Sequence, residues 1–494
     1  MLRHTLKVLL DHQRVLLTRP QSRQALAAAG LAGVALSVVV FAALTASGDR
    51  AIVASIGSTG PFLDLRHTMP AGLVRLACWF AAVSGGLGML GGLAAIRLGW
   101  RPRPGLALAA CAAAAVVFVF VPPAASIDVQ NYAEYGRIVV LGHNPYVMTP
   151  QALFRLGDPV GLLRPPEWAN QPTVYGPVAT AVEAAAAWLG GASMAWITFW
   201  IKVVNGACYL ATAVVLGRLA GPDPARAARV AVLWTINPLM LFWLVDGAHA
   251  DLLAVLPLVL ALWVLRAACR WQAQRRRAWA GAIAGALAGA AIAVKVTFAA
   301  PAAGLAAGLW RGRARQRPAM LAAGIAGCLL VLAAGYLIVG KDALNSLTQR
   351  LSSSNDSFLP VPGPVFHNAA LYAGISAAAL LLVGGLLAWR MPPDGDLPEV
   401  RPIMICALAV VMGGIVQYPW YDAMIFPFLA LLPATRLDAW LTGRIVLISC
   451  VVLPGIAIKV YQYREARIVV TVFMIAFLVA LAAGKVFTAS KETK

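Results

Sequence analysis

Apolar segments long enough to cross a lipid bilayer recur along the whole chain, and they constrain the fold more than any other feature. A transmembrane helix needs roughly 20 mainly apolar residues, and the segments at 25–46, 71–96 and 320–340 each meet that requirement. Only 12% of the 494 residues are charged, whereas 61% are hydrophobic. The sequence therefore predicts an all-α polytopic membrane protein with about 14 transmembrane helices.

The surplus of basic residues fits the same interpretation. A formal net charge of +20 would suggest nucleic acid binding in a soluble protein, but here Lys and Arg gather in short loops, as in the cytoplasmic loops of membrane proteins. We therefore expect the lipid bilayer, and no nucleic acid, as a partner. The seven cysteines are scattered and form no CxxC motif, so neither a disulfide framework nor a zinc site is indicated.

The basic loops also predict how the chain is oriented. Arg3 and Lys7 place the N-terminus in the cytoplasm, and the first apolar segment is too long for a signal peptide. The basic loops at Arg218 and Arg275 are also cytoplasmic if the segment 174–190 lies on the outer surface without crossing. We expect a multi-pass protein of the plasma (inner) membrane with both termini in the cytoplasm. Its large external loops would be 125–192 and 341–365.

This orientation places the polar clusters of the sequence on one, non-cytoplasmic face. They are Asp128 to Tyr146, Tyr175 to Pro177, Asp246 to Asp251, Lys295, Ser352 to His367, and Gln417 to Asp422. A transporter spreads its functional polar groups along a path near the middle of the bilayer. An enzyme that acts on a membrane lipid gathers them at one surface, so the distribution favours an enzyme.

Asp128 comes directly after the third apolar segment. Taken alone, an aspartate in that position is more typical of a helix cap than of a catalytic group. Glu134 and Arg137 have the i,i+3 spacing of an ion pair, and the residues up to Tyr146 have the Gly and Asn-Pro content of a turn.

Three further clusters each have a functional and a structural interpretation. Asp246, His249 and Asp251 are suitable ligands for a divalent metal ion, or they form a polar hairpin whose groups satisfy one another. Lys295 lies between two apolar halves, where a lysine costs roughly 2.5–3.5 kcal/mol, so we expect either an anionic partner, carboxylate or phosphate, or snorkelling to the surface. Trp420 and its aromatic neighbours form an interfacial belt or a stacking platform for a sugar or lipid.

The order of these motifs is more specific than any one of them. D-V-x-x-Y-x-x-Y-G begins at Asp128, G-x-N-P-Y ends at Tyr146, and Y-G-P, N-P-L, G-A-H-x-D, V-K and Y-P-W-Y follow in that order. The series, from about residue 120 to 435, resembles the polyprenyl-phosphate-mannose-dependent α-1,6-mannosyltransferases of the C-fold glycosyltransferase superfamily. The first spans and the tail beyond residue 440 add little to it.

The resemblance implies an external catalytic aspartate, which Asp128 would supply. Many members of the superfamily carry a second acid beside it, whereas this chain has Val129, so a divalent metal ion is not required and no metal ligand is assigned. We expect the donor phosphate to be bound by Lys295, His249 and Arg137. The residues expected to bind the sugar or the acceptor are Tyr132, Asn144, Tyr146, Tyr175, Asp251, Trp420 and Tyr421.

One carboxylate is enough for this chemistry. A glycosidase needs two, because its alkoxide leaving group must be protonated, whereas a polyprenyl phosphate leaves as a stable anion. A single base can take the proton from the acceptor hydroxyl as that hydroxyl attacks the anomeric carbon, and the configuration at that carbon is then inverted. The expected partners are a polyprenyl-phosphate-linked sugar and a glycan or glycolipid acceptor.

Two alternatives remain open from the sequence. The transferred sugar could be arabinose, glucose or galactose in place of mannose, because short motifs do not encode the configuration of hydroxyl groups. A lipid or solute transporter is the alternative from another class, and it would place polar residues along a transmembrane path.

Overall fold

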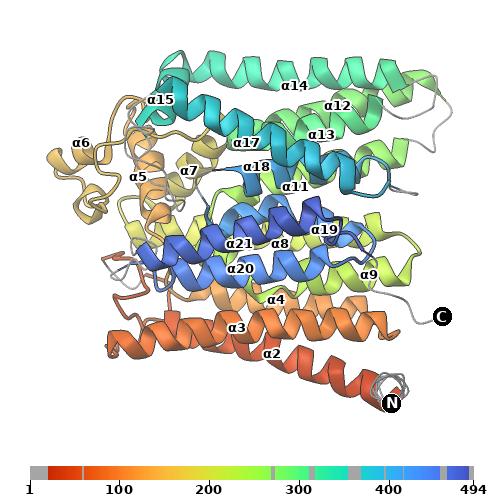
Figure 1. Ribbon diagram of the computed structural model, residues 1–494. Helices are drawn as coiled ribbons and strands as arrows, with labels where there is room; N and C mark the ends of the chain where they lie inside the picture. The colour runs from red at the N-terminus through yellow and green to blue at the C-terminus, as the bar shows by residue number, and fades with distance from the viewer. Residues whose placement is uncertain are drawn as a thin grey trace, which may run out of the picture.

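The computed structural model describes residues 20–57, 60–268, 273–310, 317–353, 369–393, 397–414, 417–456 and 464–488. The regular elements among these residues are helices, with one isolated β-bridge between Val53 and Ala124. The long helices run side by side across the molecule (Figure 1). The prediction of an all-α chain is confirmed for this part of the protein.

The N-terminal half of the chain contains α2 (Pro20–Ala46), α3 (Ala71–Arg97), α4 (Pro104–Phe120), α5 (Asp128–Val140), α6 (Pro150–Arg155), η1 (Gly161–Leu163), α7 (Pro177–Gly190), α8 (Met194–Ala220), α9 (Pro224–Val230), η2 (Ala231–Thr235), α10 (Pro238–Leu241) and η3 (Phe242–Asp246). The remainder contains α11 (Asp251–Ala268), α12 (Gln274–Val294), η4 (Val296–Phe298), α13 (Ala299–Trp310), α14 (Arg317–Val339), α15 (Asp342–Ser353), α17 (Ala369–Arg390), α18 (Val400–Gly413), η5 (Pro419–Met424), α19 (Phe426–Leu431), α20 (Leu437–Val452) and α21 (Arg464–Ala482).

Six helices in the described part of the chain are long and apolar enough to cross a membrane. They are Gln21–Ala46, Ala71–Arg97, Met194–Ala220, Asp251–Ala268, Gln274–Val294 and Pro318–Val339, and the number is seven if the bent helix pair from Pro224 to Asp246 is counted as one span. Shorter apolar helices such as Pro104–Phe120 and Val400–Gly413 lie among them. The chain is thus a multi-pass membrane protein by this criterion, while the number of about 14 spans stays a prediction.

The apolar sequence at 227–245 is long enough to predict one span, but the helix that it forms is broken at Asn237. The Asn237 side-chain oxygen accepts hydrogen bonds from the backbone N–H groups of Leu239 and Met240, both at 3.1 Å. Pro238 follows as the first residue of α10. A capping Asn followed by Pro starts a new helix, so the chain bends here by 40°.

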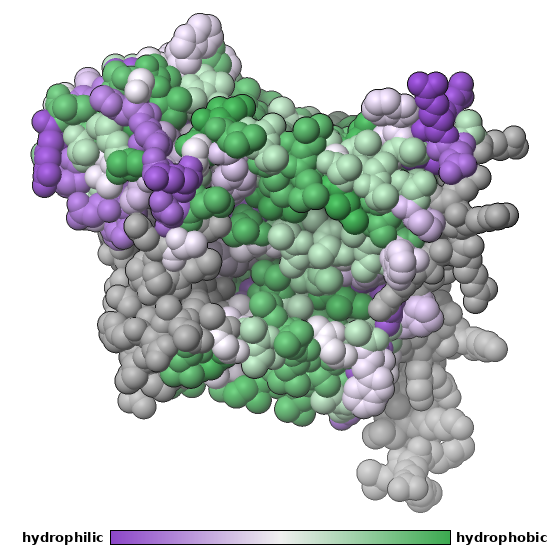
Figure 2. All heavy atoms as spheres, turned by 90° about the horizontal axis from the view of Figure 1, so that it is seen from above, coloured by the Kyte–Doolittle hydropathy of each residue, from purple (hydrophilic) through white to green (hydrophobic). Residues whose placement is uncertain are grey.

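Short helices gather at the ends of the helical array. Figure 1 places α5, α6, α7 and α15 together at one end and α9 at the opposite end. Seen from above, an apolar band lies between hydrophilic groups at the two ends of the molecule (Figure 2). Within the predicted external loop at 341–365, α15 forms the first part, and residues 354–367 of the polar cluster lie outside the described residues.

Buried ion pairs hold distant helices together inside the apolar bundle. Lys202 of α8 donates to the Asp246 carboxylate at 2.8 Å and to the Val121 carbonyl at 2.6 Å, and both charged side chains are fully buried. Arg229 forms a bidentate pair with Asp438 at 2.6 and 2.9 Å. The Lys202 contacts tie the chain just after α4 to the end of η3, which fixes the segment that leads into α5.

The helix that begins with Asp128 packs closely on α7 at one glycine. A Cβ atom at Gly136 of α5 would lie 2.1 Å from the carbonyl oxygen of Glu183 in α7. We expect Gly136→Ala to lower the free energy of unfolding by about 1–3 kcal/mol, because two helix backbones would have to separate. Thermal unfolding in detergent measures the change.

Gly217→Ala in α8 is the matched control, since a Cβ there meets no neighbouring atom within 4 Å. It should leave stability unchanged or raise it by about 0.5–1 kcal/mol through helix propensity. Equal stability of Gly136→Ala and wild type would contradict the close approach of α5 and α7.

Candidate active site

Asp128 is the first residue of α5, where the chain leaves the apolar bundle. Ile127 is the N-cap residue and makes no side-chain capping bond, while the backbone N–H of Asp128 donates to Ser126 Oγ at 3.1 Å. The Asp128 side chain is 19% exposed. A carboxylate in the first turn of a helix is stabilised by the positive end of the helix dipole, so this position suits an ionised aspartate that a ligand can reach.

His249 faces Asp128 from the turn between η3 and α11. Its Nε2 lies 3.8 Å from Asp128 Oδ2, and the ring is fully buried. Nδ1 lies 2.7 Å from the Trp243 carbonyl oxygen, and the ring stacks on Trp420 with centroids 3.8 Å apart. Burial lowers the pKa of His249 to about 3, so the imidazole is neutral at physiological pH.

Lys295 lies at the break between α12 and η4, in an extended conformation. Its ammonium donates to both carboxylate oxygens of Asp251, at 2.9 and 2.8 Å, and lies 4.3 Å from the centroid of the Tyr421 ring. Of the partners expected from the sequence, the structure therefore provides a carboxylate. The Lys295 side chain is 13% exposed, whereas that of Asp251 is fully buried, so the ammonium is the part of the pair that a ligand can reach.

Two tyrosines connect these groups. The hydroxyls of Tyr132 in α5 and Tyr175 before α7 lie 3.0 Å apart, and their rings meet edge to face at 5.1 Å. Burial raises the pKa of both phenols, and the nearby carboxylates of Asp128 and Asp251 raise it further. Both tyrosines are therefore neutral hydrogen-bonding groups.

We call these eight residues the Asp128 cluster. Its members are Asp128, Tyr132, Tyr175, His249, Asp251, Lys295, Trp420 and Tyr421. They come from parts of the chain almost 300 residues apart and combine two carboxylates, an ammonium group and hydroxyls, most of them buried.

Three residues expected in the site lie elsewhere. Arg137 pairs with Asp158 at 2.9 Å, so the expected pair with Glu134 was wrong. Asn144 accepts from the Tyr146 backbone N–H at 2.9 Å and donates to Asp342 at 3.1 Å. The Tyr146 hydroxyl lies 3.0 Å from that of Thr180 and is buried under α7. These contacts lie within the segment 125–192, which is predicted to be external, and in its contact with α15, and they join none of the three residues to the Asp128 cluster.

The suggested metal site of Asp246, His249 and Asp251 is not formed. Asp246 pairs with Lys202 and Asp251 pairs with Lys295, which draws the two carboxylates to different partners. Among the residues that the structure describes, no three His, Cys, Asp or Glu side chains converge in a way that could hold a metal ion.

The support of Trp420 was missed from the sequence. Tyr418 stacks on Trp420 at 4.4 Å, so both faces of the indole are covered, by Tyr418 and by His249. Arg444 anchors this aromatic segment through Asp422 and through Gln417 at 2.6 Å. An arginine inside an apolar segment is costly unless paired, and that signal could have identified it. Trp420 thus holds His249 in place, and a sugar ring has no uncovered face of this indole on which to stack.

Comparison with known proteins gives one family. The family model described as "Alpha-(1->6)-mannopyranosyltransferase, N-terminal domain" (MptA/B family) matches residues 27–312. No curated protein and no solved structure matches. The matched part includes six members of the Asp128 cluster, whereas Trp420 and Tyr421 lie beyond it.

Proposed function

Because the chain belongs to the alpha-(1->6)-mannopyranosyltransferase (MptA/B) family and is therefore a glycosyltransferase, we propose that it transfers mannose from a polyprenyl-phosphate donor. The acceptor is a glycan or glycolipid hydroxyl on the non-cytoplasmic face of the membrane. The observation that carries this proposal is that Asp128, a candidate base, lies near enough to Lys295 for its charge to act on the ammonium, and that both side chains are partly exposed.

Each reacting group has a partner in this arrangement. Asp128 takes the proton of the acceptor hydroxyl while the oxygen attacks the anomeric carbon of mannose. The bond from that carbon to the phosphate oxygen breaks, and the phosphate leaves with the electron pair. An ammonium has three N–H donors, and the contacts of Lys295 with Asp251 use two. The third can stabilise the departing phosphate.

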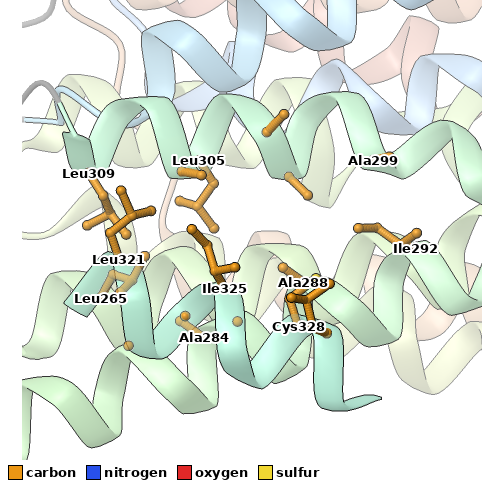
Figure 3. A pocket seen from close by; sticks show the side chains of 17 residues that line it. Leu265, Ala284, Ala288, Ile292, Ala299, Leu305, Leu309, Leu321, Ile325 and Cys328 are labelled. Carbon is orange, nitrogen blue, oxygen red and sulfur yellow. The ribbon is translucent and has the colours of Figure 1, made fainter. Parts of the chain in front are cut away.

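An apolar groove beside Lys295 supports a lipid donor. A cavity of about 260 Å³ lies among α11, α12, α13 and α14, and its lining is almost entirely apolar (Figure 3). Ile292 and Ala299, which flank Lys295 in the sequence, line one end, and Leu309 and Leu321 line the other. An isoprenoid chain in this groove would place its phosphate near the ammonium.

We expect Ala303→Phe, which fills this groove, to raise the KM for a long-chain polyprenyl donor by about tenfold, since the buried apolar contact of the lipid is worth a few kcal/mol at most. Ala303 lines the groove and is exposed, so the fold should tolerate the larger side chain. A donor truncated to one or two isoprene units should be used equally well by both proteins.

Ala109→Phe, at an exposed position of α4 outside the groove, is the control and should change neither KM. If Ala303→Phe weakened long and short donors equally, the groove would not be the lipid site.

The purified protein incubated with a panel of polyprenyl-phosphate sugars and glycan acceptors tests the function itself. We expect consumption of the mannose donor and an α-(1→6) linkage in the product. Consumption of an arabinose, glucose or galactose donor in preference to mannose would overturn the donor assignment, and absence of transfer with every donor would overturn the function.

A further inference from the structure

The imidazole of His249 is held in one orientation by contacts that no bound ligand is needed to make. Trp420 covers one face at a centroid distance of 3.8 Å and an interplanar angle of 19°, and Trp243 meets the ring at 60° and 6.0 Å. The backbone of His249 is fixed as well, because Asn205 donates to its carbonyl oxygen at 3.1 Å. The ring can neither flip nor turn away without breaking several of these contacts.

The same contacts fix which ring nitrogen carries the proton. The partner of Nδ1 is the carbonyl oxygen of Trp243 at 2.7 Å, and a carbonyl can only accept. Nδ1 is therefore the N–H donor, and in the neutral ring Nε2 carries a lone pair. Nε2 is buried and has no hydrogen-bond partner among the described residues, although it lies 3.8 Å from Asp128 Oδ2.

A neutral ring in this tautomer cannot bind a phosphate through Nε2, because a lone pair and a phosphate oxygen repel each other. This argues against the donor-phosphate role that we expected for His249. A buried acceptor with no donor is costly, so Nε2 is suited to a hydroxyl or acid proton that arrives during the reaction. The neighbouring oxygen that would carry such a proton is Asp128 Oδ2.

We infer that His249 is a positioning residue for Asp128, whose Nε2 accepts the hydrogen bond of the Asp128 carboxyl group once that group has taken the proton from the acceptor. This inference rests on the proposed function. In the step, the O–H bond of the acceptor breaks, an O–H bond forms at Asp128 Oδ2, and the acceptor oxygen binds the anomeric carbon. The phosphate leaves with the electron pair. The new O–H then points to Nε2, and the 3.8 Å separation closes by about 1 Å to hydrogen-bond length.

The arrangement acts on the protonated base and not on the donor. Nε2 repels the carboxylate before the reaction and stabilises the carboxylic acid after the proton has moved, which favours proton removal in the transition state. In the proposed mechanism the phosphate is stabilised by a different group, the ammonium of Lys295, which is paired with Asp251. Loss of His249 should therefore resemble a weakened base and not a weakened donor site.

A set of His249 variants with hydroxyl and thiol acceptors tests this role. We expect His249→Ala to lower kcat with the natural acceptor by roughly 10- to 100-fold, less than loss of the base itself, with an unchanged KM for the donor. His249→Gln, whose amide oxygen reaches the region of Nε2, should recover part of the rate, and the shorter His249→Asn should not. With an acceptor that carries a thiol in place of the attacking hydroxyl, the kcat of His249→Ala should lie within about threefold of the wild-type kcat, because a thiol ionises without a strong base.

His143→Ala, at an exposed histidine of the same end of the protein, is the control and should behave as wild type. A raised KM for the donor in His249→Ala would indicate that His249 binds the donor phosphate, and it would overturn the inference. An equal loss with thiol and hydroxyl acceptors would overturn it too, because it would mean that the variant damages the site generally. Failure of the wild type to transfer mannose would instead refute the proposed function, so the two failures are distinguishable.

Discussion

Asp128→Asn is expected to lower the rate of sugar transfer by at least about 100-fold, since a general base contributes roughly 10²- to 10⁴-fold. Asparagine has nearly the shape of aspartate but cannot accept a proton, so the protein yield and the affinity for the donor should stay at the wild-type level. The side chain is 19% exposed and faces His249 at 3.8 Å, and an amide can occupy that place. Initial rates with a labelled donor, together with donor binding measured separately, give both quantities.

Glu134→Gln is the matched control on the same helix. Glu134 is fully buried, and burial raises the pKa of its carboxyl group well above the usual value. Burial thus favours the neutral carboxylic acid, and glutamine has the shape of that neutral form. Full activity of Asp128→Asn, or a loss of activity in Glu134→Gln as large as that in Asp128→Asn, would refute the assignment of the base.

The Lys295→Met variant is expected to lose both stability and activity. Removing one partner of a buried pair leaves the other charge uncompensated, which costs about 3–5 kcal/mol. Asp251 is fully buried and both its carboxylate oxygens contact the ammonium. We expect a lower unfolding temperature in detergent and no measurable transfer.

A second substitution separates the two effects. The double variant Lys295→Met/Asp251→Asn has no uncompensated charge, so most of the stability should return. Transfer should stay absent, because no other group replaces the ammonium at the phosphate. Asp251→Asn alone keeps the ammonium and should retain part of the activity. A double variant that is stable and as active as wild type would show that Lys295 has no role in the transfer reaction.

Much of the site could be predicted because its parts violate the apolar pattern. Lys295 and Asp251 stand in or beside apolar segments where charge is costly, so each needs a partner, and the structure pairs them. Asp128 was less distinctive alone, and only the order of the motifs identified it. That resemblance, placed at about residues 120 to 435, is confirmed at the level of the family by a match over 27–312. The match begins earlier and ends sooner than expected, so the first spans do belong to the family pattern.

The remaining parts depend on tertiary contacts that spacing along the chain does not encode. Arg137 had a suitable acid three residues away, yet it pairs with Asp158 in the loop after α6. The role of Trp420 depends on what covers its two faces, Tyr418 and His249, and these residues are far apart in the sequence. The break at Asn237 was visible as Asn-Pro, but the apolar residues on both sides hid it within one segment.

The stack of His249 on Trp420 joins the region shared with the family to the region beyond it. The candidate catalytic residues lie before residue 312, and the aromatic ring that holds His249 in its orientation lies more than 100 residues later. The candidate catalytic residues and the ring that supports one of them are thus encoded by separate stretches of sequence. A substitution of Trp420 would therefore act on Asp128 through His249, although Trp420 lies outside the region matched by the family.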